Sequence, residues 1–278
     1  MPLLDKITLR SVSLKSIGTA AALLLTLGAG LPAARAQEEH AVEPPTQNWT
    51  FGGFFGTFDR ASAQRGFQVY KEVCSTCHSM HLMYYRDLGP SGPGGGLGFS
   101  EDEVKAIAAE YKVADTNDAG EPIERTALPS DKFHNPFPND KAAAAANGGK
   151  VPPDLSLMAK ARGAGGETDG PNYVFAFLTG FHDAPEGFQV PDGLNYNAYF
   201  PGHVTAMPNI LTDGAVTYTD GTNATHEQMA WDVVNFLMFT AEPAMEERKH
   251  TGVKVILFLI IFAGLLYSVK RKVWATAH

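Results

Sequence analysis

The stretch VCSTCH, residues 73–78, contains the only two cysteines among the 278 residues of the chain. Two cysteines that are separated by two residues and followed at once by a histidine form the C-x-x-C-H pattern, which attaches a c-type haem. One turn of chain can present both sulfurs to the porphyrin edge while the next residue places its imidazole under the iron. The pattern therefore predicts thioether bonds from Cys74 and Cys77 and an axial iron bond from His78.

The N-terminus has the features of a secretory signal. An apolar run at residues 16–31 follows three basic residues and precedes Ala34-Arg35-Ala36. A positive flank, a short apolar run and a small-x-small site predict a signal peptide over residues 1–36, cleaved after Ala36. A retained N-terminal anchor is the alternative, and the shortness of the run argues against it. Residues 37–249 are then expected to form an exported haem domain.

A second apolar stretch, residues 253–269, predicts one transmembrane helix near the C-terminus. Basic residues flank it at 248–250 and 270–272, and Tyr267 and Trp274 suit a membrane interface. A buried globular helix is the alternative, which the flanking charges disfavour. Residues 250–278 are therefore expected to supply a membrane anchor and a short cytoplasmic tail.

These two segments predict a location. Because the chain is exported and its basic C-terminal end stays inside, the positive-inside rule is satisfied. We expect a single-pass protein of a bacterial-type inner membrane, with the haem domain in the periplasm.

Two other uses of the paired cysteines follow from an exported compartment. A C-x-x-C pair can form a redox-active disulfide, which requires a strand and then a helix that begins at the motif. A zinc site would need two more ligands at similar spacing, and the sequence has no second C-x-x-C. The histidine that directly follows Cys77 favours the haem interpretation.

The charge of the chain is uneven. Its net charge is −8, and because lysine and arginine concentrate at both ends, residues 37–249 are more negative still. Such a domain repels nucleic acid and anionic lipid headgroups, and it steers a basic partner toward itself.

Two helices are predicted to flank the haem. Residues 61–73 are predicted to form a short helix that leads into the motif, with Phe67, Tyr70 and Cys74 along one face. Residues 225–241 open with a T-x-x-Q capping pattern, end before a proline and carry an apolar stripe. Gly66 offers a point where a second helix can cross closely. Two crossed terminal helices around a haem fit a class I cytochrome c core.

The sixth iron ligand decides the class of function. A haem with an open position binds small molecules, whereas a haem with two protein ligands is suited to electron transfer. Met207 is the main candidate, because YFPGHVTAMP, residues 199–208, is a loop without helical period that carries one thioether sulfur. His203 and an open position remain alternatives at this point.

Several segments in order along the chain resemble the cytochrome c1 family. They are RGFQVYKEVCSTCHSM (65–80), YRDLG (85–89), PPDLSLMAKAR (152–162), YFPGHVTAMP (199–208) and AEP (241–243), followed by a single C-terminal anchor. The resemblance covers about residues 49–274, which is nearly the whole expected mature chain.

The resemblance implies a redox subunit of ubiquinol–cytochrome c oxidoreductase, the cytochrome bc1 complex, with one covalently bound haem c. In that family the haem takes electrons from the Rieske iron–sulfur protein and passes them to a soluble cytochrome c, and cytochrome b is a further partner. The subunit is expected to have no substrate-binding catalytic site of its own. A basic soluble cytochrome c would suit the acidic domain.

The family pattern also implies roles for single residues. It places the axial iron bonds on His78 and Met207, Arg162 and Tyr173 near the haem propionates, and Pro153 against the haem. The guanidinium of Arg162 offers a fork of donors suited to a carboxylate, although alone it is equally consistent with a solvated surface arginine. A proline carbonyl could orient the His78 imidazole.

The expected fold is mainly α: a class I cytochrome c-like haem domain with long loops and insertions, plus one C-terminal transmembrane helix. The Gly-rich residues 89–98 are expected to form a surface loop, and residues 142–146 a short helix. A stand-alone membrane-tethered electron carrier would share all of the haem residues. A haem enzyme or sensor with an open sixth position is the other alternative.

Overall fold

The structure is a computed structural model that describes residues 42–163 and 165–275. The predicted signal peptide, residues 1–36, lies outside the described residues. The α-helices are α2 (Arg60–Glu72), α3 (Glu101–Ala109), α4 (Asp140–Ala146), α5 (Met158–Ala161), α6 (Asp169–Thr179), α7 (His226–Ala241) and α8 (Met245–Trp274). Short 3-10 helices are η1 (Cys74–Thr76), η2 (Tyr85–Leu88), η3 (Pro93–Gly95) and η4 (Pro201–His203), and the strands are β1 (Lys112–Thr116), β2 (Pro122–Thr126), β3 (Asn195–Tyr196) and β4 (Val204–Thr205).

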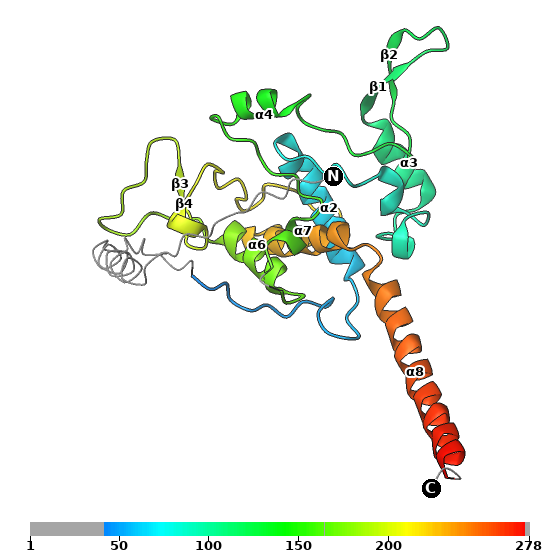
Figure 1. The fold of residues 1–278 in the computed structure, drawn as a ribbon. Coiled ribbons are helices and arrows are strands. Elements are labelled where there is room, and N and C mark those ends of the chain that lie inside the picture. The colour runs from blue at the N-terminus through cyan, green and yellow to red at the C-terminus, as the bar shows by residue number, and fades with distance from the viewer. Residues whose placement is uncertain (1–41, 164, 276–278) are drawn as a thin grey trace, which may run out of the picture. The chain divides into compact units, whose positions relative to one another are not determined.

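Helices α2 and α7 cross at the centre of the domain (Figure 1), as the sequence predicts. The Asp59 side chain caps α2 and the Thr225 side chain caps α7, each by accepting a hydrogen bond from a backbone N–H of the first turn. A Cβ atom on Gly66 would lie 1.9 Å from the Asp232 carbonyl oxygen, so only glycine permits this close approach. The predicted crossing point is thus confirmed.

Aromatic and methionine side chains fill the core around this crossing. Phe67 on α2 meets Phe236 on α7 with ring centroids 5.6 Å apart, and Trp49 stacks on Trp231 at 4.2 Å. The methionines at 80, 83, 229, 238 and 245 are all fully buried among these residues. They therefore serve as core packing.

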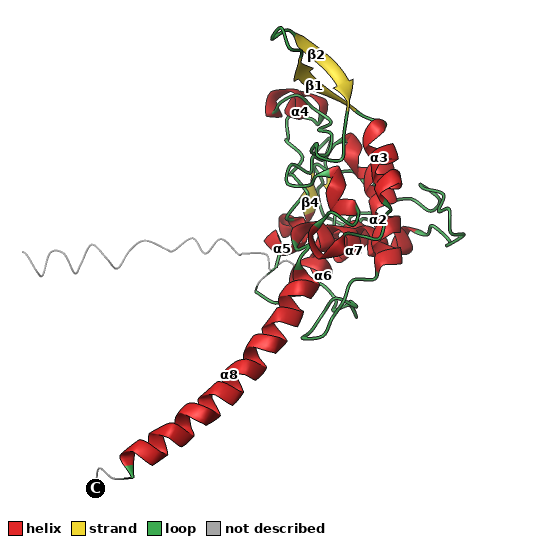
Figure 2. Ribbon diagram, turned by 90° about the vertical axis from the view of Figure 1, so that its right-hand side faces the viewer, coloured by secondary structure: helices red, strands yellow, loops and turns green. Residues whose placement is uncertain are grey.

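Strands β1 and β2 form an antiparallel hairpin that the sequence analysis did not predict (Figure 2). Lys112 pairs with Thr126, and both strands are largely exposed. The guanidinium of Arg125 bonds to Asp115 and, at 2.5 and 2.9 Å, to Asp131. Because charged side chains rather than an apolar face hold the hairpin, its sequence lacks the alternation that indicates a strand.

The Gly-rich residues 89–98 form a mostly exposed loop, as the sequence predicts, and one of its side chains is buried. They form a loop around η3, but Leu97 within it is fully buried and its N–H donates to the Leu88 carbonyl at 2.9 Å. The segment is therefore a folded loop with an apolar anchor, and only part of it lies at the surface. The short helix expected at residues 142–146 is confirmed as α4.

Helix α8 projects from the domain as a single long helix (Figure 2). It extends beyond the predicted apolar span, residues 253–269, on both sides, and the side chains of that span from Lys254 onward are exposed. Among the described residues, α8 is the one helix that is long and apolar enough to cross a membrane.

Candidate haem site

The cysteine motif lies at the end of α2, where the chain tightens into η1. The N–H groups of Cys77 and His78 both donate to the Cys74 carbonyl oxygen, at 3.1 and 2.9 Å. Cys74 is buried, Cys77 is half-buried, and the two are not joined in a disulfide. The motif thus forms one compact turn, as the attachment of both sulfurs to one porphyrin edge requires.

The imidazole of His78 is oriented by a single carbonyl group. Its Nδ1 atom lies 2.8 Å from the Pro153 carbonyl oxygen, and because a carbonyl only accepts, Nδ1 carries the proton. Nε2 then keeps the lone pair that an iron ligand needs. Burial lowers the pKa of His78, against the smaller effect of the Pro153 bond, so the neutral form prevails at neutral pH. The structure therefore identifies Pro153 as the orienting proline.

A network centred on Asp154 holds Pro153 in place. The Asp154 carboxylate accepts hydrogen bonds from Ser79 Oγ at 3.0 Å and from the His81 N–H at 2.7 Å. Its other oxygen accepts from the Ser156 N–H at 2.9 Å. Burial alone would raise the pKa of Asp154, but hydrogen bonds from Ser156, His81 and Ser79 together lower it. The sequence analysis missed this residue, although PPDLS (152–156) contains it.

Arg162 and Tyr173 lie close together in the fold. Arg162 ends α5 and is exposed, and Tyr173 is half-buried on α6. Burial raises the pKa of Tyr173, and the positive charge of Arg162 opposes that rise. The helices can approach because Gly170 has no side chain: a Cβ there would lie 1.8 Å from the Ala159 carbonyl oxygen. Contact of this pair with haem propionates stays a prediction.

Met207 lies in the loop after β4. Its side chain is half-buried and packs against the core, and its N–H donates to Thr205 Oγ1 at 3.2 Å. His203 sits in the preceding hairpin with φ +58°, its Nδ1 3.3 Å from the Asn197 carbonyl oxygen and its ring stacked on Tyr196. Packing against the core favours Met207 over His203 as the sixth ligand, and this assignment stays a prediction.

The two competing uses of the cysteines fit the structure poorly. Burial raises the pKa of Cys74 to about 12, whereas redox-active cysteines have a lowered pKa. The motif also follows a helix instead of beginning one. Within residues 42–163 and 165–275, no group of three or more His, Cys, Asp and Glu residues could hold a metal ion. The arrangement of Cys74, Cys77 and His78 fits a covalent haem.

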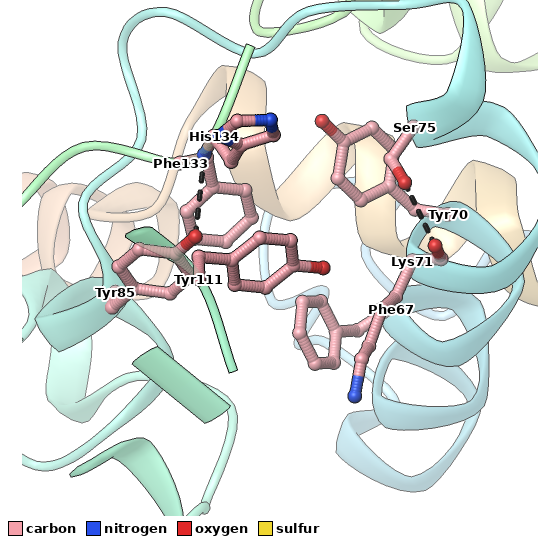
Figure 3. A pocket seen from close by; sticks show the side chains of 8 residues that line it. All are labelled: Phe67, Tyr70, Lys71, Ser75, Tyr85, Tyr111, Phe133 and His134. Atoms are coloured by element: carbon pink, nitrogen blue, oxygen red, sulfur yellow. Dashed lines mark hydrogen bonds between the residues drawn. The ribbon is translucent and has the colours of Figure 1, made fainter. Parts of the chain in front are cut away.

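A small aromatic pocket lies beside Ser75, which belongs to the cysteine motif (Figure 3). It is lined by Phe67, Tyr70, Lys71, Ser75, Tyr85, Tyr111, Phe133 and His134. Tyr85 Oη accepts from the His134 N–H at 3.2 Å, and Ser75 Oγ donates to the Lys71 carbonyl at 2.7 Å. None of the predicted site residues lines it. Of its rings, Tyr70 reaches the cysteine turn, because its hydroxyl donates to the His78 carbonyl oxygen at 3.4 Å.

Motif and fold together define a mainly helical protein of the c-type haem class with one apolar terminal helix. Comparison with protein families matches residues 49–277 to the Cytochrome C1 family. The chain belongs to the cytochrome c1 family.

Curated relatives agree with this assignment. "Cytochrome c1-2, heme protein, mitochondrial" of Solanum tuberosum is 50% identical over 84% of this chain and 86% of that protein. "Cytochrome b-c1 complex catalytic subunit, mitochondrial" of Candida albicans is 44% identical over 85% of this chain and 79% of that protein. "Cytochrome b/c1" of Bradyrhizobium diazoefficiens is 48% identical over 97% of this chain, which spans only 41% of that longer protein.

These findings confirm the predicted family and the mainly helical fold class with one C-terminal apolar helix. The names of the relatives agree with the predicted haem c and with an electron-transfer role in a bc1 complex.

Proposed function

We propose that this chain is the c-type haem subunit of a cytochrome bc1 complex, which takes electrons from a Rieske iron–sulfur protein and passes them to a soluble cytochrome c. The observation that carries the proposal is the C-x-x-C-H turn with His78 Nδ1 fixed on the Pro153 carbonyl oxygen. When bound, the haem supplies one-electron redox chemistry. The chain itself supplies attachment, orientation and a buried setting, and we expect it to act without a substrate-binding catalytic site of its own.

Each residue of the turn has a distinct task. Cys74 and Cys77 would form the thioethers, and His78 would bind iron through Nε2, because Nδ1 is committed to Pro153. Met207 would be the second protein ligand of the iron, and its half-buried position limits the access of water to the thioether. A His/Met pair raises the potential of a haem, which suits an acceptor of electrons from a high-potential iron–sulfur centre.

The Arg162 and Tyr173 pair would bind the haem propionates. The exposed guanidinium of Arg162 is a planar donor fork that matches a carboxylate, and the Tyr173 hydroxyl lies in its electrostatic field. Burial keeps that hydroxyl protonated and able to donate a hydrogen bond.

The acidic composition of the domain supports a basic soluble cytochrome c as the acceptor. Opposite charges speed diffusional encounter and still allow rapid release, and salt screens them. Helix α8 would anchor the chain as a single membrane pass, with the basic residues 270–272 on the cytoplasmic side and the haem domain in the periplasm. Cytochrome b would be its neighbour within the membrane.

Replacing Met207→Leu tests the axial assignment. In the full-length holoprotein the variant should keep its covalent haem, show a lower reduction potential and bind carbon monoxide in the ferrous state. Met158→Leu is the matched control, because Met158 is also half-buried against the core and should leave the potential unchanged. An unchanged potential without carbon monoxide binding in Met207→Leu would remove Met207 from the iron.

Purification from native membranes tests the assembly. A subunit of a bc1 complex should co-purify with a b-type cytochrome and a Rieske protein. A stand-alone tethered carrier would purify without them while showing the same haem spectrum.

A further inference from the structure

The segment FGGFFGTF, residues 51–58, holds two aromatic side chains out into solvent. Phe51 and Phe58 at its ends are buried in the core, whereas Phe54 is 56% exposed and Phe55 is 80% exposed. The rings of Phe54 and Phe55 contact each other edge to face, with centroids 5.0 Å apart. A pair of adjoining exposed phenylalanines forms a small apolar patch of the kind that marks an interaction surface.

The loop that carries these two rings is tightly closed. The Thr57 N–H donates to the Thr50 carbonyl oxygen at 3.0 Å, and the Gly56 N–H donates to the Gly53 carbonyl oxygen at 3.3 Å. Gly53 has φ +75°, which favours glycine, and a Cβ on Gly56 would lie 2.3 Å from the Gly52 carbonyl oxygen. The glycines therefore make a tight turn, which keeps the rings of Phe54 and Phe55 out of the core.

Both ends of the loop are hydrogen-bonded to side chains in the first turns of α8. The buried Lys249 ammonium donates to the Phe51 carbonyl at 2.6 Å and to the Gly53 carbonyl at 2.7 Å. At the other end the Phe58 N–H donates to Glu246 Oε1 at 2.7 Å. The position of the loop is thus fixed relative to the helix that carries the apolar span.

The buried face of α8 ends where that span begins. Lys249 precedes Val253 by four residues, which is about 6 Å along a helix axis. Met245, Lys249, Gly252 and Val253 share one helical face, the first two buried and the last two half-buried, whereas α8 is exposed from Lys254 onward. Figure 1 shows the chain before α2, in blue, on the side of the domain from which α8 leaves.

We propose that Phe54 and Phe55 insert into the headgroup region of the lipid bilayer beside α8. The proposal rests on the proposed role of α8 as a membrane anchor. Aromatic side chains favour the membrane interface, and residues 50–58 include no charged side chain that would oppose insertion. The hydrogen bonds that hold the loop to Glu246 and Lys249, just before the apolar span begins at Val253, identify lipid as the occupant. The loop thereby becomes a second point of attachment, which stops the domain from tilting about the helix.

Spin labelling of the full-length holoprotein in lipid nanodiscs tests the proposal. A label is attached at Phe55→Cys, and its collision rates with oxygen and with a water-soluble nickel chelate are measured. Leu259→Cys, in the middle of the apolar span, is the lipid reference. Ile123→Cys on β2 is the water reference, because Ile123 is 41% exposed and β2 lies away from α8 (Figure 1). Phe54→Cys repeats the measurement at the neighbouring ring.

The expected result is that labels at positions 54 and 55 collide with nickel several-fold less often than the label at position 123, while oxygen access stays high. Nickel access at 54 and 55 equal to that at 123, with position 259 in lipid, would overturn the loop proposal alone. Nickel access at position 259 would instead overturn the membrane anchor. Low access of both reagents at 54 and 55, confined to the assembled complex, would assign the patch to a protein partner and overturn the lipid assignment.

Discussion

The crossing of α2 and α7 predicts a large effect of Gly66→Ala. The added Cβ atom would lie 1.9 Å from the Asp232 carbonyl oxygen and 2.8 Å from Phe236 Cβ, whereas an ordinary contact begins at 3.4 Å. Because the nearest atom belongs to the α7 backbone, no side-chain rotation can relieve the overlap. The two helices must move apart by about 1 Å or more, in a core packed at crystal-like density.

The magnitude follows from opposing contributions. Overpacking of a core costs about 1–3 kcal/mol, and alanine regains about 1 kcal/mol over glycine through its helix propensity. Separation also strains the hydrogen bonds that the buried Asp232 carboxylate accepts from Ser62 Oγ at 2.6 Å and from Arg65 at 2.9 and 3.0 Å. Weakening bonds to a buried charge costs about 1.5–3 kcal/mol. We expect a net loss of roughly 1.5–5 kcal/mol from the sum of these contributions.

Urea unfolding of the holoprotein in detergent, followed by circular dichroism and by the haem absorption band, measures this loss. Gly252→Ala is the matched control, because Gly252 is also helical and a Cβ there meets nothing within 4 Å. It should be neutral or slightly stabilising. A Gly66→Ala protein as stable as the control would refute the close crossing of the two helices.

Two further predictions concern carboxylates. Asp154→Ala removes the acceptor for the His81 N–H and should destabilise the haem domain by about 1–3 kcal/mol. Hydrogen exchange at the His81 amide should become faster. An unchanged exchange rate would contradict the Asp154 network. Burial alone would raise the pKa of Glu242, but hydrogen bonds from Lys160 and Arg248 outweigh it, and the pKa lies below its usual value. The stability from Glu242 is therefore present above the ordinary glutamate pKa of about 4.3 and is lost as pH falls through the lowered folded value. Glu242→Gln should flatten the decline in unfolding free energy below that pH, and an identical pH profile would count against the ion pairs.

Local signals in the sequence are sufficient for the helices around the motif. The predicted helix at residues 61–73 is α2, Arg60–Glu72, and the one at 225–241 is α7, His226–Ala241. Within each helix, the capping residue and the apolar face lie within a few residues of one another in the sequence, and Gly66 lies within α2 itself. The cysteine motif is equally local, which is why Cys74, Cys77 and His78 could be singled out at once.

Contacts between distant segments were not predictable in the same way. The sequence suggested a proline carbonyl for His78, but the choice of Pro153 depends on a contact across 75 residues. From the sequence alone, Lys249 is interpreted as one of the basic residues that flank the membrane span. In the structure its ammonium is buried against the Phe51 carbonyl, 198 residues away. Contacts between residues so distant in sequence depend on the tertiary fold, and no local sequence pattern predicts them.

The junction between the haem domain and α8 bears on the proposed electron transfer. The Lys249 ammonium binds Glu167 at 2.8 Å in addition to the carbonyl oxygens of the 51–58 loop, and Glu246 binds the Arg60 guanidinium at 2.8 Å. The Lys249 side chain is buried, and a buried charged group is costly to separate from its partners because its charge would be left uncompensated. The domain is therefore not free to swivel on its anchor, and the protein fixes the height of the haem site above the apolar span. Redox partners must then come to the haem, since the haem domain cannot carry it to them.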